Sequence, residues 1–137
     1  MEYCLNCDKE VEVTVRTVPE VLAVKGEPFS VVSSIAYCNC CGEPVWVDEL
    51  EEGNLINAFA AYRDKHGLLH PTDIRRIRER YGMTAEAFSV ALGLDREAIA
   101  HYERGSLQSE EENAVIAAAD VPEDFLLMLI RNTAVTV

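Results

Sequence analysis

Two C-x2-C motifs, separated by 30 residues near the start of the chain, constrain the fold more than any other feature. The first pairs Cys4 with Cys7, and the second pairs Cys38 with Cys41. Each motif places two thiols on the same side of a tight turn, and two such turns together supply four sulfur ligands to a tetrahedral ion. In a cytosolic chain this clustering favours metal over disulfides. We therefore predict one structural Zn²⁺ per chain on these four cysteines, with reduced thiols or an opportunistic disulfide as the alternative.

A fifth cysteine, Cys40, lies inside the second motif, and Gly42 follows that motif. We expect the Cys40 side chain to point away from the metal as a free thiol, with a ligand role as the minority alternative. The glycine suits a metal-binding turn because it permits positive φ and close backbone approach. The segment holds few large apolar side chains, so metal binding should supply part of its folding free energy.

The segment between the motifs is rich in β-branched residues, and residues 10–16 alternate polar with apolar side chains. Alternation with period two predicts a strand with one solvent-exposed face. Pro19, Gly26 and Pro28 interrupt the segment, so we predict two or three short antiparallel strands with a hairpin tip at residues 25–27.

Beyond residue 48 the apolar residues repeat with helical spacing. Leu55, Phe59 and Tyr62 lie at i, i+4 and i+7 and predict a helix at about 49–65. Glycine and proline then mark a hinge at 67–71. Five short helices follow, delimited by glycines, N-capping residues and a proline: Gly82, Thr84, Gly93, Asp95, Gly105, Ser109 and Pro122.

The predicted fold class is therefore α+β. A small zinc-bound antiparallel β domain, which includes the helix at about 49–65, should occupy residues 1–66. An all-α domain of five helices should occupy residues 72–137.

The charge is unevenly distributed along this acidic chain, whose formal net charge is −12. Residues 1–70 carry 5 basic and 12 acidic side chains, whereas residues 71–108 carry 6 of each. An acidic protein is not held to nucleic acid by bulk charge, because neutralising phosphates requires Lys and Arg. The acidic N-terminal part suits a basic protein partner, and the arginine cluster between Arg75 and Arg80 is the place where phosphate contacts are expected.

Several function classes are disfavoured. The longest uncharged stretch, residues 28–42, is too short to span a bilayer, and the N-terminus lacks the features of a signal peptide. We therefore expect a cytoplasmic protein without membrane association. The sequence contains no G-x-S-x-G, P-loop or H-E-x-x-H motif, so we expect no enzymatic activity.

Residues 84–104 have the length and punctuation of a helix-turn-helix, with two helices, Thr84–Leu92 and Asp95–Arg104, joined by a Gly-containing turn. Spacing alone fits a generic helical bundle about as well. Two sequence motifs make the helix-turn-helix prediction more specific: I-R-R-I-R-E-R-Y-G-M-T at 74–84 and A-I-A-H-Y-E-R-G at 98–105. Both resemble the corresponding segments of the Xre/Cro-like helix-turn-helix family.

A two-cysteine-pair module in front of such a domain looks like the MqsA family of type II toxin–antitoxin antitoxins, in which a YgiT-type zinc finger precedes an Xre helix-turn-helix. That resemblance implies an N-terminal zinc domain that engages a toxin, usually an mRNA-cleaving ribonuclease. It also implies a C-terminal domain that dimerises and represses the operon. The expected partners are a basic toxin, operator DNA and a second copy of the chain.

Carried onto this sequence, the resemblance places the base-reading positions at Glu97 and His101, where the family more often has an amide and an arginine. These departures matter, because a glutamate can only accept hydrogen bonds, for instance from cytosine N4. Arginines of the cluster and of the third helix remain for phosphate binding. The predicted DNA-binding set is Arg75, Arg76, Arg80, Thr84, Arg96, Glu97 and His101.

Three further side-chain roles follow from the residues. Arg78 and Glu103 are predicted to form an ion pair between the first and third helices of this domain, in preference to a phosphate contact by Arg78. Trp46 is expected to pack against the sheet. Residues 125–130 are apolar on all sides, so core closure and a homodimer interface are both expected there. The predicted interface residues are Phe125, Leu126, Leu129 and Ile130.

Two alternative functions remain open. The first alternative to the antitoxin is a zinc-dependent protein-interaction module whose helix-turn-helix has lost DNA binding. The second is a stand-alone transcription regulator without a toxin. The product of the neighbouring gene and binding to the chain's own promoter separate these alternatives from the antitoxin.

Overall fold

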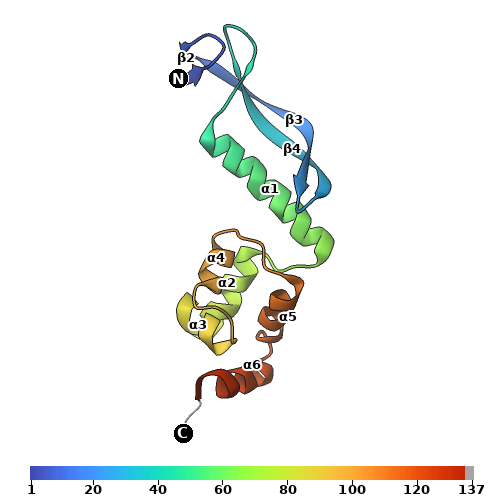
Figure 1. Ribbon diagram of the computed structural model, residues 1–137, viewed down its shortest axis with the longest axis vertical. Coiled ribbons are helices and arrows are strands. Elements are labelled where there is room, and N and C mark those ends of the chain that lie inside the picture. Colours follow the sequence, from blue (N-terminus) through green and yellow to red (C-terminus); the bar gives the residue numbers. More distant parts are fainter. Residues whose placement is uncertain (135–137) are drawn as a thin grey trace. The chain divides into compact units, whose positions relative to one another are not determined.

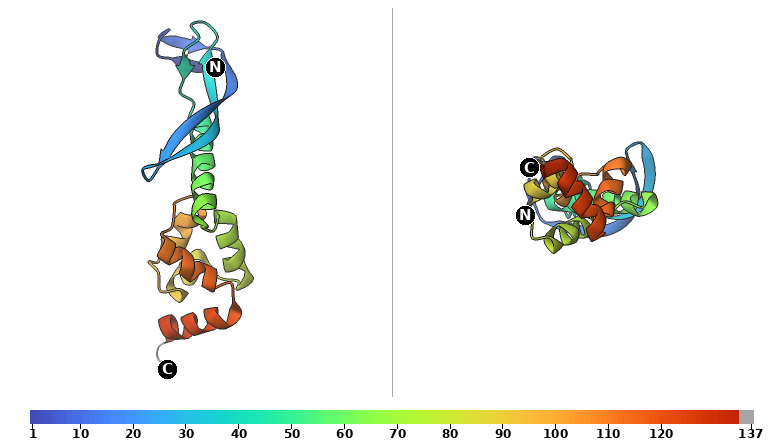
Figure 2. Two further views of the ribbon diagram at one scale, coloured as in Figure 1. Left: turned by 90° about the vertical axis from the view of Figure 1, so that its right-hand side faces the viewer. Right: turned by 90° about the horizontal axis from the view of Figure 1, so that it is seen from below.

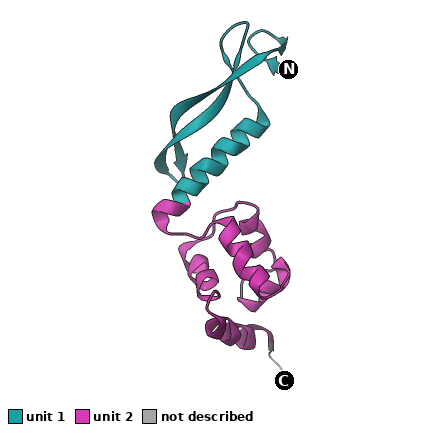
Figure 3. Cartoon of the chain, turned by 180° about the vertical axis from the view of Figure 1, so that it is seen from behind, with its two compact units in different colours: residues 1–62 teal, residues 63–137 magenta. Residues whose placement is uncertain are grey.

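A computed structural model of the chain describes residues 1–134. The chain divides into two compact units, residues 1–62 and 63–137 (Figure 3). Antiparallel strands form the N-terminal part and helices form the rest, so the predicted α+β class is confirmed. No helix among the described residues is long and apolar enough to cross a membrane.

The first unit contains two antiparallel sheets (Figure 1). The short strands β1 and β2 form one, and the second has the order β3-β4-β5. The strands are β1 (Glu2–Cys4), β2 (Lys9–Val11), β3 (Val13–Val24), β4 (Glu27–Cys38) and β5 (Pro44–Val45).

The hairpin of β3 and β4 is longer than the sequence suggests, with 12 residues in each strand. The expectation of short strands broken at Pro19 is wrong, because Pro19 lies within β3 and pairs in register with Val32. Since β3 is an edge strand, a residue without an N–H can be accommodated there. The predicted hairpin tip is present, and both of its turn residues, Lys25 and Gly26, have positive φ of 50° and 81°.

Helix α1 (Asp48–His66) lies along one face of this hairpin (Figures 1 and 2). It begins one residue earlier and ends one residue later than predicted. The buried amide of Asn54 accepts from the Ser34 N–H at 2.8 Å and donates to the Ser34 carbonyl at 2.9 Å. The Phe29 ring packs edge-on against Tyr62, with centroids 5.8 Å apart. The Asn54 bonds hold the second turn of α1 against β4, and the ring contact holds the helix near its C-terminal end.

The second unit contains the five predicted α-helices, followed by a π-helical turn, η1 (Figure 2). The fully buried side chains of Ile74, Ile77, Phe88, Ile99 and Ile116 form the centre of its core. The elements are α2 (Pro71–Arg80), α3 (Ala85–Ala91), α4 (Ala98–Glu103), α5 (Glu110–Ala118), α6 (Pro122–Leu129) and η1 (Ile130–Ala134).

The predicted N-caps at Thr84 and Ser109 are present, since each hydroxyl accepts from the backbone N–H three residues later, at 3.1 Å and 3.0 Å. Helix α4 starts later than predicted. The Asp95 carboxylate accepts from the Glu97 N–H and the Asp95 carbonyl from the Ala98 N–H, which forms a turn before the helix. Glu97 is therefore the N-cap residue of α4.

The segment that leads into α2 is bound to the helical unit. The Arg63 side chain is buried, and its Nη2 donates to the Gly105 carbonyl at 2.8 Å, just after α4. Burial lowers the pKa of this guanidinium. The Leu69 N–H donates to Asn113 Oδ1 at 2.8 Å, and Gln108 Nε2 donates to the Leu69 carbonyl at 2.8 Å. Residues 63–70 thus share hydrogen bonds with the loop and helix that follow α4.

Replacing Asn113 by Ala tests this connection. The change leaves the Leu69 N–H without its acceptor and removes one acceptor of buried Gln108, which should cost on the order of 2 kcal/mol. In the full-length protein, amide hydrogen exchange at the core residues Ile99 and Ile116 should therefore accelerate roughly 30-fold. The exposed Ser106→Ala variant is the control. Equal exchange in both variants would contradict a structural role for these hydrogen bonds.

Candidate metal centre and nucleic-acid interface

The two cysteine motifs fold into turns of the same geometry. In the first, the Asp8 N–H donates to the Cys4 carbonyl at 2.7 Å, and in the second the Gly42 N–H donates to the Cys38 carbonyl at 2.9 Å. The residue after each motif has positive φ, 56° at Asp8 and 80° at Gly42. Glycine adopts this conformation freely, and aspartate is one of the few other residues that tolerate it. The Tyr3 hydroxyl also donates to the Asp8 carboxylate.

The four predicted ligands converge on one point. Cys4 Sγ lies 3.6 Å from Cys41 Sγ, Cys7 Sγ lies 3.8 Å from Cys38 Sγ, and all four sulfurs lie within 4.8 Å of one another. A tetrahedral ion with Zn–S bonds of about 2.3 Å requires sulfurs about 3.8 Å apart. The spacing therefore fits a metal ion without rearrangement of the chain.

The pKa values of these cysteine thiols are shifted in opposite directions by the backbone and by the neighbouring thiols. Backbone N–H donation, from Cys41 above all, lowers the pKa of Cys38, and backbone donation from Glu43 with the Asn6 side chain lowers the pKa of Cys41 to about 6. Hydrogen bonding to Cys41, followed by burial, raises the pKa of Cys7 well above its usual range. Four thiolates this close together repel one another, so a cation is needed to hold all of them in the ionised form.

This site can hold a metal ion in a structural role. Four thiolates form a soft ligand set that suits tetrahedral Zn²⁺ and also iron. All four positions are taken by protein, which leaves none for water or a substrate. Cys4 and Cys38 are buried among apolar residues of the small core that includes Val11, Ala36 and Val45. A bound ion would thus crosslink the ends of β1 and β4.

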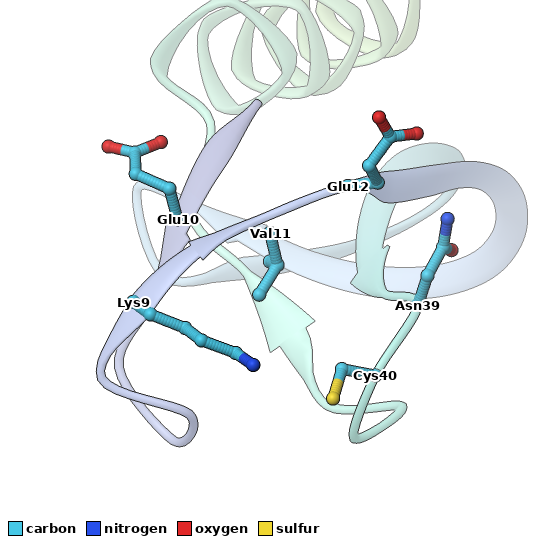
Figure 4. Close-up of a pocket in the computed structure, with 6 residues that line it drawn as sticks. All are labelled: Lys9, Glu10, Val11, Glu12, Asn39 and Cys40. Carbon is cyan, nitrogen blue, oxygen red and sulfur yellow. The ribbon is translucent and has the colours of Figure 1, made fainter.

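Cys40 lies outside this cluster and is exposed. Its backbone N–H donates to Cys38 Sγ at 3.3 Å, while its thiol faces a shallow depression of about 290 Å³ (Figure 4). Lys9, Glu10 and Asn39 also line that depression. The geometry agrees with the expected free thiol.

Metal content tests the site directly. Freshly purified, reduced protein should contain about one equivalent of metal per chain, expected to be zinc. Cys38→Ser should reduce this below half an equivalent, because it removes one of the four sulfurs. Cys40→Ser, a matched change two residues away, should retain the metal. A loss of metal from Cys40→Ser as large as that from Cys38→Ser would exclude the proposed ligand set.

The turn between α3 and α4 is fixed from two sides. Buried Ser89 donates through Oγ to the Ala85 carbonyl at 2.8 Å and accepts from the Ile99 N–H at 3.1 Å, which joins the two helices. Gly93 has φ of 76°, and a Cβ there would lie 3.1 Å from the side chain of Asn132. That asparagine donates to the Ala91 carbonyl at 3.0 Å. Two helices joined by such a tight turn have the form of a helix-turn-helix, a motif in which the second helix reads DNA.

The arginine cluster does not form one surface. Arg76 and Arg80, at i and i+4 on α2, both contact the Asp120 carboxylate, at 3.5 Å and 2.7 Å. Arg75 instead lies beside α4, with its Nε 3.2 Å from Glu103 Oε1. Helical spacing thus turns Arg76 and Arg80 toward the α5–α6 corner, whereas Arg75 lies on the side of α2 that faces α4. Phosphate binding by these three arginines stays a prediction.

The predicted base-reading residues lie on one stripe of α4. Glu97 and His101 are exposed, and Glu97 Oε2 lies 3.8 Å from His101 Nε2. The exposed Arg104 continues the stripe at i+7 from Glu97. Arg104 has no carboxylate partner among the described residues, whereas Arg96 pairs with Glu86 at 2.8 Å. Sequence reasoning missed Arg104, although its spacing from the two predicted positions could have identified it. Thr84 Oγ1 accepts from the Ala87 N–H as the N-cap of α3, and its own O–H proton stays available to a phosphate.

The expected ion pair between Arg78 and Glu103 is present. Arg78 Nε and Nη2 donate to the two Glu103 oxygens at 2.6 Å and 2.8 Å, and Arg78 Nη1 donates to the Met83 carbonyl at 2.9 Å. Burial alone would raise the pKa of Glu103, but the bonds from Arg78 and then Arg75 hold that pKa below its usual value. This pair fixes α4 against α2.

The predicted dimer residues fall into two groups. Phe125 is buried in the core of its own unit, where its ring stacks on Tyr81 with centroids 4.0 Å apart, so it is not available to a second chain. Leu129 is partly buried against the same core. Leu126 and Ile130 are more than half exposed, and Leu127 joins them on the outer face of α6.

Residues 74–118 match the profile of the helix-turn-helix family HTH_3, from the first turn of α2 to the end of α5. These residues therefore form an Xre-like helix-turn-helix domain, the type found in DNA-binding transcription regulators. The match confirms the predicted helix-turn-helix. A comparison of the whole chain with curated proteins finds no match.

Glu103→Gln tests how far the reading helix depends on its ion pair. Removing one partner leaves a largely buried arginine uncompensated, so the helical unit should lose on the order of 3 kcal/mol of unfolding free energy. Because folding lowers the pKa of Glu103, the wild-type gain is present above the unfolded pKa of about 4.3 and is lost as the pH falls. Urea unfolding should thus show a flatter acid dependence in Glu103→Gln, while the exposed Glu97→Gln should resemble wild type in both respects.

Proposed function

We propose that this chain is the antitoxin of a type II toxin–antitoxin pair, a cytoplasmic, non-enzymatic protein that binds a toxin through residues 1–66 and represses its own operon. The observation that carries the proposal is the combination, in one chain, of a four-thiol cluster with an Xre-like helix-turn-helix domain. That combination matches the MqsA-like arrangement described above. The metal in this proposal is one structural Zn²⁺.

The DNA-binding half of the proposal rests on α4. Its exposed stripe offers Glu97 and His101 to base edges and Arg104 to a base or a phosphate. The exposed ion pair of Arg96 with Glu86 is weak enough for a phosphate to compete with it. The exposed apolar side chains of Leu126 and Leu127 on α6 and of Ile130 at the start of η1 supply a surface for the second copy that a two-fold operator requires.

The toxin-binding half rests on charge. Residues 1–62 carry 3 basic and 11 acidic side chains, so the field of this unit favours a basic partner and opposes nucleic acid. An mRNA-cleaving ribonuclease must itself attract phosphates, which makes a basic toxin the natural complement.

One observation favours the alternative of a protein-interaction module without DNA binding. Arg75, Arg76, Arg80 and Arg96 all have carboxylate partners within their own unit, so few cations near α4 are free to meet phosphates.

A gel shift with the protein's own promoter distinguishes a DNA-binding repressor from an interaction module without DNA binding. Arg104→Gln should weaken binding roughly fivefold and lower the slope of log affinity against log salt by about one. Arg76→Gln, which removes the same charge from the α5–α6 corner, should bind like wild type. Equal affinity for promoter and random DNA at moderate salt would contradict the repressor half and leave the interaction module.

Co-expression with the product of the adjacent gene tests the toxin half. That product alone should arrest growth, and the full-length chain should restore growth and co-purify with it. A harmless neighbour, or a toxic one that does not bind this chain, would contradict the antitoxin.

A further inference from the structure

Trp46 does not pack against the sheet, which corrects the expectation from the sequence. It is the single tryptophan of the chain and is 71% exposed. Its indole Nε1 donates to Asp48 Oδ1 at 2.7 Å, across the start of α1. This hydrogen bond orients the ring and leaves most of its surface in solvent. An exposed tryptophan in a fixed orientation has little conformational entropy to lose on binding, and tryptophan is among the residues most enriched in binding hot spots.

Trp46 separates two grooves on the first unit. The larger, of about 440 Å³, has apolar walls formed by Leu22 of β3 and Leu55 of α1 together with the indole. The smaller, of about 230 Å³, lies between Trp46 and the first cysteine turn, where Tyr3 and Leu5 line it. Leu5 is 87% exposed and Leu55 is half exposed. Apolar side chains from four separate segments thus face solvent along one strip, which we call the Trp46 surface.

Carboxylates border this strip. Glu20, Glu51 and Glu52 line the larger groove, and Glu43 lines the smaller. None of these four carboxylates forms an ion pair among the described residues, and no Lys or Arg lines either groove. No ion pair within residues 1–134 therefore neutralises this negative charge. Such a border repels nucleic acid and phosphorylated ligands, and favours cationic groups.

The apolar walls and the acidic border together define the chemistry of the occupant. A cation alone would leave Leu22, Leu55 and Leu5 in water, and an apolar segment alone would leave the carboxylates uncompensated. A polypeptide that carries Lys or Arg next to leucine-like side chains satisfies both. Its cation can lie over the indole face, where the negative face of the ring attracts a positive charge.

We propose that the Trp46 surface is the docking site for a basic, apolar-containing segment of a protein partner. The partner meant is the toxin, so this part of the inference rests on the proposed function. Tyr3 and Leu5, beside and within the first cysteine turn, line the smaller groove, so the geometry of that turn also shapes the docking site.

The fluorescence of the single tryptophan tests the docking site. Full-length, metal-loaded protein is titrated with a short acetylated peptide amide in which arginine alternates with leucine. The emission of Trp46 should change saturably, and the apparent affinity should fall as salt rises. A peptide with glutamate in place of arginine should cause no change. A peptide with serine in place of leucine should bind at least tenfold more weakly, because it cannot use the apolar walls.

Two matched variants separate the grooves from general attraction to an acidic protein. Glu51→Gln/Glu52→Gln should weaken binding of the arginine–leucine peptide at least tenfold. Glu110→Gln/Glu111→Gln removes the same charge from α5 and should alter binding less than twofold. Equal weakening by both pairs, or no saturable change in emission, would overturn the docking site. If the peptide does not bind but the full-length chain restores growth in the co-expression test, the docking site is refuted and the antitoxin proposal stands. If the peptide binds but the product of the neighbouring gene is harmless, only the antitoxin proposal is refuted.

Discussion

The mutual repulsion of four sulfur atoms within 4.8 Å is the constraint on which the first unit depends. Their positions are set by two matching turns, yet the buried core beside them consists of a few small apolar residues. Such a core supplies little free energy to hold the turns together. A divalent cation bound here would replace this repulsion with four metal–sulfur bonds, and its binding free energy would then contribute to folding of this end of the unit. The long hairpin and α1 extend from that point and are held further along by the Asn54 and Phe29 contacts.

The helical unit solves a different problem, since it must hold a reading helix of only six residues. So short a helix has no independent stability. Contacts from three directions compensate: Arg78 binds Glu103 from α2, Ser89 joins α3 to the start of α4, and the Tyr102 hydroxyl donates to Glu112 of α5. The Arg63 guanidinium then binds the carbonyl that follows α4. The orientation of this helix is thus determined by contacts that do not involve its exposed side chains Glu97, His101 and Arg104.

Much of this architecture is readable from local sequence rules. Cysteine spacing identifies the four thiols that converge, and N-caps such as Thr84 and Ser109 locate the helices, because these signals act over a few residues. Features that depend on tertiary contacts are not readable in this way. Pro19 suggests a strand break until β3 is known to be an edge strand, and the ion pair of Arg76 with Asp120, 44 residues away in sequence, is not visible from the arginine cluster itself. Trp46 reads as a core residue because burial is its average behaviour, and only the position of Asp48 reveals its exposed orientation.

Pro19 has a consequence beyond the fold of its own strand. A twelve-residue edge strand exposes a row of backbone donors and acceptors that can template pairing with a neighbouring molecule. The outer face of β3 and β4 bears exposed valines, including Val21 and Val32, which would make such a pairing adhesive. A proline at the middle of the edge removes one donor and interrupts any continuous intermolecular ladder. Pro19, which makes β3 hard to predict from the sequence, therefore also opposes aggregation by edge-to-edge pairing of this strand.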